Sequence, residues 1–311
     1  MANLSVIVPV HNEEQAIAGV IAELHAALAG AASPRGAEPE QARGHTPPAL
    51  GAFEILVVDD GSTDGTAQAA RGAAEGKPEV RILTRDRNRG YGSAIKHGIR
   101  HAAHDVVGII DGDGSYPAAQ LPELLRAMGD AAMVVGARPR AGAVTALRRP
   151  AKWLLTRLAS YLADEPIPDL NSGMRIFRRD VYERFANLLP RQFSFTTTLT
   201  LAVLCDDLPV AFVPIEYRKR LGRSKIRPVR DTLSFLLLIA RTVTHFRPLK
   251  VLGPLAAAVF LAGVAKGAWN LLAPDDPARG PNLKTSDLLL LVAGVQLFAL
   301  AMLADLVAKR R

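Results

Sequence analysis

Two aspartates separated by one glycine follow a short, wholly apolar run at residues 106–110. They are Asp111 and Asp113, with Gly112 between them. In an extended segment alternate side chains point the same way, so both carboxylates can converge on one point, and the glycine lets a ligand approach the backbone. A hard cation such as Mg²⁺ is typically held by one or two carboxylates plus substrate phosphates. The pattern predicts a divalent-metal site for Mg²⁺ or Mn²⁺, with an acidic turn as the alternative.

Two further polar clusters follow β-rich runs nearer the start of the chain. One contains Pro9, Asn12 and Glu13, and the other begins with Asp59 and Asp60. In open α/β sheets ligands bind just outside the carboxyl ends of the strands, so clusters at adjacent strands can line one pocket. We interpret the three carboxylates of these clusters as candidate acceptors for the base and ribose donors of a nucleotide. A turn or capping role is the alternative for Asp60.

A glycine-rich stretch at residues 88–93 precedes a helical pattern. Glycines at that place permit the backbone to approach an anion at the helix N-terminus, so the stretch is a candidate anion site. The seven histidines show no metal-ligand spacing, and the sequence has neither a Gly-x-Ser-x-Gly elbow nor a Walker loop. We therefore expect neither zinc chemistry nor serine hydrolysis.

The composition narrows the class of protein. The chain has 311 residues, 49% of them apolar, which is enough for a substantial core. The formal net charge of +8 indicates an anionic partner, which could be nucleic acid, an acidic membrane face or a phosphorylated substrate. The single cysteine, Cys205, excludes an intrachain disulfide and favours a reducing compartment. The apolar stretch 4–10 lacks a basic flank, so we expect a strand there rather than a signal peptide.

The polar clusters need a parallel sheet to bring them together, and the first part of the chain has the pattern of one. Short β-rich runs alternate with longer helical patterns up to residue 135, which is typical of βαβ units. The expected strands are 5–10, 54–59, 80–84, 106–110 and 132–135. Residues 29–52, which are rich in Gly, Pro and Ala without periodicity, are expected to form a flexible insertion. The prediction is an α/β fold with a mostly parallel sheet and flanking helices.

The C-terminal part has the pattern of a membrane attachment. Residues 229–247 are expected to form an amphipathic helix that suits a membrane surface. The stretches 251–272 and 288–307 are each long enough for a spanning helix, which needs about 20 residues. Lys266 and Asp305 interrupt these stretches, so a spanning hairpin needs snorkelling or a polar helix–helix contact. A water-soluble helical hairpin is the alternative.

Basic residues flank the two expected spans on the same side. Arg247 and Lys250 precede the first span, and residues 309–311 follow the second. The positive-inside rule places both ends of the hairpin in the cytoplasm. We therefore expect a multi-pass inner-membrane protein, with residues 1–228 as a cytosolic domain and residues 248–311 as a transmembrane hairpin.

Six short motifs, in this order along the chain, resemble those of the family 2 glycosyltransferases with a GT-A fold, and within them the polyprenyl-phosphate (dolichol-phosphate) mannosyl- and glucosyltransferases. The family's Pro-x-x-Asn-Glu, Asp-Asp-x-Ser and Asn-x-Gly-x-Gly are matched by Pro9, Asn12 and Glu13, by Asp59, Asp60 and Ser62, and by Asn88, Gly90 and Gly92. Its Asp-x-Asp, Asp-x-x-Ser-Gly-x-Arg and Arg-x-Gly-x-Ser-Lys are matched by Asp111 and Asp113, by Asp169, Ser172, Gly173 and Arg175, and by Arg220, Gly222, Ser224 and Lys225. Tyr91 stands where mannosyl members often carry Lys.

The resemblance implies a site for each of two substrates. The donor, a UDP- or GDP-linked nucleotide sugar, would be bound by Pro9, Asn12, Glu13, Asp59, Asp60, Asn88, Gly90 and Asp111. Asp111 and Asp113 would hold Mg²⁺ or Mn²⁺ against the donor diphosphate and so assist the leaving nucleotide. The acceptor, a polyprenyl phosphate, would be bound through its phosphate by Ser172, Arg175, Arg220, Ser224 and Lys225. Arg175 would join the two aspartates as a catalytic residue, and the anomeric centre would be inverted.

The expected partners are the nucleotide sugar, the lipid phosphate and membrane lipids, with no nucleic acid. Polar residues within the spans are compatible with a homo-oligomer. Two other functions stay open. A processive polysaccharide synthase shares the fold and the Asp-x-Asp, but its usual Gln-x-x-Arg-Trp is absent, because neither Trp153 nor Trp269 follows an arginine. A non-catalytic scaffold that binds nucleotide sugars is the other, and the presence of both Asp111 and Asp113 argues against it.

Overall fold

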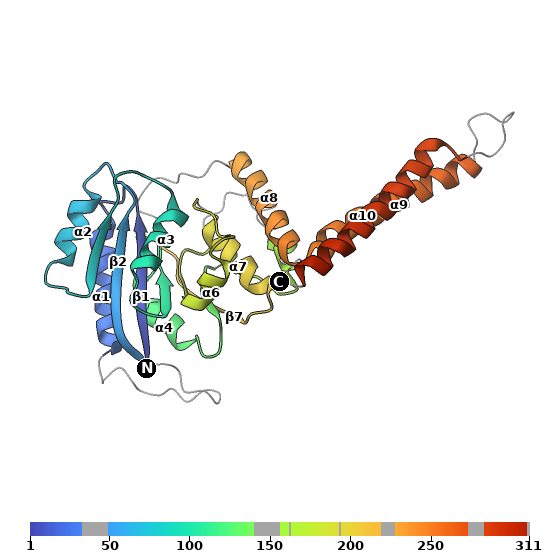
Figure 1. The fold of residues 1–311 in the computed structure, drawn as a ribbon. Helices are drawn as coiled ribbons and strands as arrows, with labels where there is room; N and C mark the ends of the chain where they lie inside the picture. Colours follow the sequence, from blue (N-terminus) through green and yellow to red (C-terminus); the bar gives the residue numbers. More distant parts are fainter. Residues whose placement is uncertain are drawn as a thin grey trace. The chain divides into compact units, whose positions relative to one another are not determined.

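The computed structural model describes residues 1–32, 49–139, 156–161, 163–192, 194–218, 228–272 and 283–309. The chain forms two units, which are drawn in Figure 1. Unit 1 comprises Met1–Tyr161 and Glu165–Leu236, and unit 2 comprises Leu162–Asp164 and Leu237–Arg311.

A seven-stranded sheet forms the centre of unit 1, in the spatial order β3-β2-β1-β4-β6-β5-β7. Its strands are β1 (Ala2–Val10), β2 (Leu50–Asp59), β3 (Val80–Thr84), β4 (Val106–Ile109), β5 (Met133–Ala137), β6 (Arg175–Arg178) and β7 (Val210–Pro214). β1 pairs in parallel with β2 and β4, β2 with β3, and β5 with β7, whereas β6 is antiparallel to both of its neighbours. The predicted α/β fold with a mostly parallel sheet is confirmed.

Each of the five predicted strands is present, and two strands, β6 and β7, are not among those predicted. β2 begins at Leu50, inside the stretch 29–52 that the sequence suggests is an insertion. Residues 29–32 of that stretch belong to the first helix, α1 (Ile17–Ala32). The remaining residues, 33–48, lie outside the described part of the chain.

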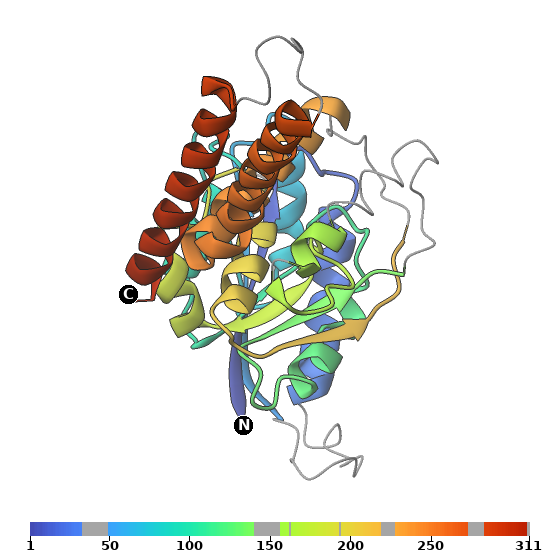
Figure 2. The same ribbon diagram turned by 90° about the vertical axis from the view of Figure 1, so that its right-hand side faces the viewer.

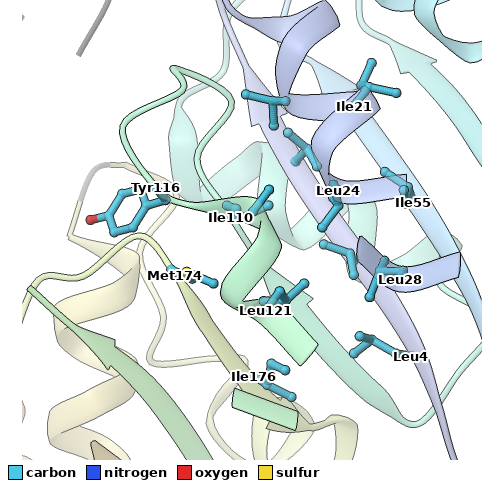
Figure 3. Packing of buried hydrophobic residues seen from close by; sticks show 14 of the residues in the cluster. Leu4, Ile21, Leu24, Leu28, Ile55, Ile110, Tyr116, Leu121, Met174 and Ile176 are labelled. Carbon is cyan, nitrogen blue, oxygen red and sulfur yellow. The ribbon is translucent and has the colours of Figure 1, made fainter. Parts of the chain in front are cut away.

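The central strand β1 is buried on both faces, as expected for a parallel sheet covered by helices on each side. One face packs against α1, and Figure 3 shows Ile21, Leu24 and Leu28 of this helix beside Leu4 of β1 and Ile55 of β2. The same core extends to α4 (Leu121–Arg126), which follows the short 3₁₀ helix η2 (Ala118–Gln120).

The other helices of unit 1 are α2 (Thr66–Ala74), α3 (Tyr91–His101), α6 (Arg179–Phe185) and α7 (Phe195–Cys205). α3 lies on the opposite face of β1 and β2, where Gly98 is close to Ile7 and Val58. The absence of a side chain at Gly98 lets the helix approach the sheet. α7 is buried along its whole length and lies against α3 and α6. These contacts fix the start of α3, from which site residues project.

α8 (Pro228–Phe246) begins in unit 1 and ends in unit 2, and the two following helices, α9 (Pro248–Leu272) and α10 (Thr285–Ala308), belong to unit 2. α9 and α10 lie side by side as a hairpin, as both ribbon views show (Figures 1 and 2). Their backbones approach closely, because a β-carbon added at Gly294 would lie 2.7 Å from Cα of Phe260.

A polar cluster joins the two helices of the hairpin. Asp287 of α10 is fully buried and accepts hydrogen bonds from Lys266 Nζ at 2.8 Å and Asn270 Nδ2 at 2.6 Å, both on α9. The lysine that interrupts the first apolar stretch is therefore satisfied by a helix–helix contact. Asp305, which interrupts the second, pairs with Lys309 at 2.9 Å on the same helix.

Both α9 and α10 are long and apolar enough to cross a membrane. The predicted spans 251–272 and 288–307 fall inside them. The hairpin exposes many large apolar side chains, among them Leu261, Trp269, Leu289, Val295, Phe298 and Leu303. The prediction of a C-terminal hairpin of two apolar helices is confirmed.

We predict that Gly98→Ala destabilises unit 1. The added β-carbon would lie 2.6 Å from Ile7 Cγ2 and 3.1 Å from Val58 Cγ2, and overpacking of this kind costs about 1–3 kcal/mol. The matched control is Gly19→Ala in α1, where nothing lies within 4 Å of the new carbon and alanine gains at most about 1 kcal/mol of helix propensity. Thermal unfolding should show a lower midpoint for Gly98→Ala only; equal midpoints for both variants would contradict this packing.

Candidate functional site

The three polar clusters predicted from the sequence lie at one edge of the sheet. They follow the carboxyl ends of β1, β2 and β4, which are neighbouring parallel strands. Val10 is level with Asp59 in the β1–β2 register, and Ile7 is level with Ile109 in the β1–β4 register. The parallel pairing therefore brings together residues that are about a hundred positions apart in the sequence.

Hydrogen bonds tie the loop after β1 to the loop after β2. Asn12, whose φ is 56°, accepts a hydrogen bond from Thr63 N–H at 2.8 Å, and its own N–H donates to Ser62 Oγ at 3.0 Å. The N–H of Glu13 donates to Thr66 Oγ1 at 2.8 Å. Asn12 and Glu13 are thus held in place by the turn that opens α2.

Asp59 and Asp60 are both buried at the end of β2 but contact different segments. Asp59 Oδ1 accepts from Ser62 N–H at 3.0 Å and from its hydroxyl at 2.5 Å, so it closes its own turn. Asp60 accepts from Arg85 at 2.9 Å and from the N–H groups of Arg89 and Gly90 at 3.0 and 2.7 Å. Asp60 therefore anchors the loop that precedes α3.

The glycines of this loop accommodate protein backbone. A β-carbon at Gly92 would overlap the carbonyl oxygen of Pro190, and one at Gly90 would lie 2.8 Å from that of Arg191. Ser93 N–H donates to the Arg191 carbonyl at 2.8 Å. The sequence suggests an anion at this helix N-terminus, whereas the structure places the segment 190–192 there. Asn88 is exposed, and its side chain accepts a hydrogen bond from Gly90 N–H at 2.9 Å.

Asp111 and Asp113 follow β4 with one glycine between them. Oδ1 of Asp111 accepts a hydrogen bond from the Tyr91 hydroxyl at 2.6 Å. Oδ1 of Asp113 accepts from Ser115 N–H at 3.0 Å and from its hydroxyl at 2.5 Å. Gly112 is required by packing, because a β-carbon there would overlap the side chain of Val10.

Asp111 and Asp113 bring two carboxylates together where little water reaches them. Burial and then the charge of Asp113 raise the pKa of Asp111 from 3.8 to about 6, against the opposing effects of Tyr91, Arg138 and Arg175. Burial and the nearby Asp111 raise the pKa of Tyr91 well above its usual range, so its hydroxyl remains a donor. A cation beside this pair would relieve the cost of the charge.

The carboxylate oxygens of Asp111 and Asp113 fit a divalent cation that also binds a substrate. The described residues contain no group of three or more His, Cys, Asp or Glu side chains placed to hold a metal. Two carboxylates alone are a common protein contribution to a Mg²⁺ site, in which phosphate oxygens and water complete the shell.

Two predicted acceptor-site residues, Ser172 and Arg175, are fully buried. Ser172 Oγ donates to the Gly136 carbonyl at 2.6 Å. The Arg175 guanidinium donates to the carbonyls of Thr196 at 2.9 Å and Ser172 at 2.5 Å, and to Thr200 Oγ1 at 3.0 Å. In this structure the Ser172 hydroxyl and the two terminal nitrogens of Arg175 bind neighbouring protein groups, whereas the buried Arg175 Nε has no hydrogen-bond partner in the described part of the chain. Both side chains are closed to a phosphate by their burial. The other three predicted residues, Arg220, Ser224 and Lys225, lie outside the described residues.

Sequence reasoning missed the contacts of Tyr91, Tyr116 and Arg138. Arg138 forms two parallel hydrogen bonds with Asp169, at 2.6 and 2.9 Å, and its guanidinium lies 5.2 Å from the ring centre of Tyr217. The Tyr116 hydroxyl accepts from Gly173 N–H at 2.7 Å. Tyr91 could have been found from its place inside the glycine motif, whereas Arg138 resembles the other charges of a basic loop.

Two family models match this chain, and similar proteins are known. A model described as glycosyl transferase family 2 matches residues 5–185, which is more than half of the chain, and one described as the GtrB C-terminal hairpin matches residues 247–309. A dolichyl-phosphate hexose transferase of Haloferax volcanii is 30% identical over 73% of this chain and 87% of its own length. An undecaprenyl-phosphate 4-deoxy-4-formamido-L-arabinose transferase of Klebsiella pneumoniae is 28% identical over 95% of this chain and 83% of its own.

Solved structures with the same fold include two phosphoglycerate glycosyltransferases. Glucosyl-3-phosphoglycerate synthase from Mycobacterium tuberculosis, in complex with Mn²⁺, UDP and glucosyl-3-phosphoglycerate, has a TM-score of 0.53 and 23% identity, covering 78% of this chain and 79% of that one. Mannosyl-3-phosphoglycerate synthase from Rubrobacter xylanophilus has a TM-score of 0.55 and 19% identity, covering 80% and 74%. Likeness at this level of identity shows the fold. By the match of its family model, the chain belongs to glycosyl transferase family 2.

Proposed function

We propose that the protein transfers a sugar from a UDP- or GDP-linked donor to a polyprenyl phosphate at the cytoplasmic face of a membrane, with inversion of the anomeric centre. The observation that carries the proposal is the Asp111–Asp113 pair at the carboxyl edge of the sheet, where family 2 enzymes would bind the donor diphosphate. The relatives in Haloferax volcanii and Klebsiella pneumoniae are named as transferases for dolichyl and undecaprenyl phosphate. The apolar hairpin suits an enzyme whose acceptor has its tail in a bilayer.

Asp111 and Asp113 would hold Mg²⁺ or Mn²⁺ together with the two phosphates of the donor. The bound cation supplies neutralisation of the charge that builds on the leaving nucleoside diphosphate. The raised pKa of Asp111 supports this assignment, because it marks negative charge that the protein itself does not balance. A Mn²⁺ and UDP complex of a protein with the same fold is consistent with it.

The nucleotide would lie over the loops that follow β1 and β2. Asn12, Glu13 and Asp59 stand at this edge with Pro9, and they are the candidates for contacts with base and ribose. Asp60 would act indirectly, by holding the loop before α3, because its oxygens already accept hydrogen bonds from Arg85 and the backbone N–H of Gly90. Together with Asn88, these residues would shape the loop against which the donor rests.

The acceptor phosphate does not need deprotonation, because its second pKa is near 6 and it is mostly dianionic at neutral pH. The enzyme must attract and aim it. We assign this contact to Arg220, Ser224 and Lys225, since guanidinium and ammonium groups bind phosphate strongly. Arg175 and Ser172, which are buried, would instead keep β6 and α7 in place beneath the site.

The proposed division of the chain follows from these roles. Residues 1–228 would form the cytosolic catalytic domain, 229–247 a helix at the membrane surface, and 248–311 the membrane anchor. Arg247 and Lys250 before the first span, and the basic residues from Lys309 onward, support a cytoplasmic position for both ends of the hairpin.

The function is tested with purified full-length protein in vesicles that contain undecaprenyl phosphate, with Mg²⁺ or Mn²⁺ and a panel of UDP- and GDP-sugars. We expect one donor to give a lipid-linked monosaccharide. A growing polymer would favour a polysaccharide synthase. Neither transfer nor donor hydrolysis with any sugar, in a folded protein, would overturn the proposal in favour of a scaffold.

Replacement of Asp113 with Asn should lower the transfer rate by about 100-fold or more, because several kcal/mol of transition-state stabilisation depend on the cation. The matched control is Asp105→Asn, at the opposite end of β4, where the side chain is fully exposed. The rates are measured at saturating donor and metal. Undiminished turnover in a folded Asp113→Asn protein would reject the metal assignment.

Replacement of Asp111 with Asn should stabilise the metal-free protein at neutral pH while it abolishes transfer. The pKa of Asp111 is higher in the folded state, about 6, than its unfolded value of 3.8, so its ionisation opposes folding above pH 6 and this cost fades as the pH falls toward 4. The full cost is at most about 3 kcal/mol. Thermal midpoints of variant and wild type in a metal chelator should differ more at pH 7.5 than at pH 4.5; a pH-independent difference would show that the Asp111 charge is not the cause.

A further inference from the structure

Two segments from elsewhere in the chain lie against the two oxygens of the Asp111 carboxylate. Oδ1 accepts the hydrogen bond of the Tyr91 hydroxyl at 2.6 Å. Tyr91 is the first residue of α3, and the whole of this contact lies within unit 1. A carboxylate has about four lone-pair positions, so one bond from a phenol leaves others for a cation.

The second oxygen of Asp111 rests against Gly173. A β-carbon at position 173 would overlap Oδ2 of Asp111, so only glycine leaves room for the carboxylate there. Gly173 is itself held, because its N–H donates to the Tyr116 hydroxyl at 2.7 Å. The Asp111 carboxylate thus lies between the start of α3 and the segment that leads into β6.

Tyr91 also links Asp111, the proposed metal ligand, to Asp60 in the loop after β2. It directly follows Gly90, whose N–H donates to Oδ2 of Asp60 at 2.7 Å. Asp60 directly follows β2, and Asp111 follows β4. The path from Asp60 through Gly90 and Tyr91 to Asp111 therefore joins two of the clusters at the sheet edge through one hydrogen bond at each end.

We propose that Tyr91 is a positioning residue that orients Asp111 for the divalent cation and couples it to the loop beneath the donor nucleotide. The proposal rests on the proposed function, in which Asp111 is a metal ligand. Groups that hold a metal ligand in place from outside the coordination shell typically change metal affinity by 10- to 100-fold when they are removed. Without the phenol, the carboxylate can rotate away from the position that the cation requires.

The test is direct measurement of Mn²⁺ binding to the purified full-length protein in the presence of UDP or GDP, by electron paramagnetic resonance of free Mn²⁺. Tyr91→Phe should raise the Kd for Mn²⁺ about 10-fold. Gly173→Ala, which displaces the other oxygen, should weaken binding as well. The matched control is Tyr182→Phe, which removes the hydroxyl of a tyrosine whose ring packs near Phe195 in α7. The Kd of this control for Mn²⁺ should equal that of the wild type.

Kinetics add a second readout. Tyr91→Phe should raise the metal concentration needed for half-maximal transfer more than it lowers the rate at saturating metal, which a general loss of fold would not do. Thermal midpoints are recorded for every variant, and a wild-type midpoint for Tyr91→Phe shows that its higher Kd does not come from a loss of fold. A wild-type Kd in folded Tyr91→Phe would overturn the inference while the metal site stands. No Mn²⁺ binding by the wild type would overturn the metal site and the inference together.

Discussion

Two negative charges brought together at the carboxyl edge of one strand are the constraint on which the site depends. Asp111 and Asp113 are both largely removed from water, and burial and then the charge of Asp113 raise the pKa of Asp111. Hydrogen bonds from Tyr91 and Ser115 hold the two carboxylates, and the positive charges of Arg138 and Arg175 only partly oppose the rise in the pKa of Asp111. A site built in this way gains most from a divalent cation that brings its own phosphate ligands.

Other buried carboxylates of the same chain show the contrast. Asp60 receives a guanidinium and two backbone N–H groups, and Asp287 in the hairpin receives a lysine and an asparagine. These two are satisfied by the protein and have structural roles, in the donor loop and in the contact between α9 and α10. Asp111 and Asp113 instead accept hydrogen bonds from the neutral hydroxyls of Tyr91 and Ser115 and from the backbone N–H of Ser115.

Much of the fold could be predicted because its signals are local. The apolar runs of β1, β2 and β4 and the two long apolar C-terminal stretches have periods and lengths that few other structures share. β6 escaped prediction because it has only four residues, begins and ends with arginine, and gains its place by antiparallel pairing with β4 and β5. The local pattern of a four-residue strand does not contain such a pairing.

The site could be predicted as a set of residues but not as a set of contacts. Asp111 and Asp113 are recognisable from spacing, whereas the bond from Tyr91 depends on how α3 lies over the sheet. Arg175 has the residue type of a phosphate ligand, yet it is fully buried and its two terminal nitrogens donate to the carbonyls of Ser172 and Thr196. The most direct test of the central claim is anomalous diffraction at the manganese edge from crystals grown with Mn²⁺ and UDP or GDP. The account predicts a peak within bonding distance of Asp111 and Asp113 and beside the diphosphate; a bound nucleotide whose Mn²⁺ contacts neither carboxylate would contradict it.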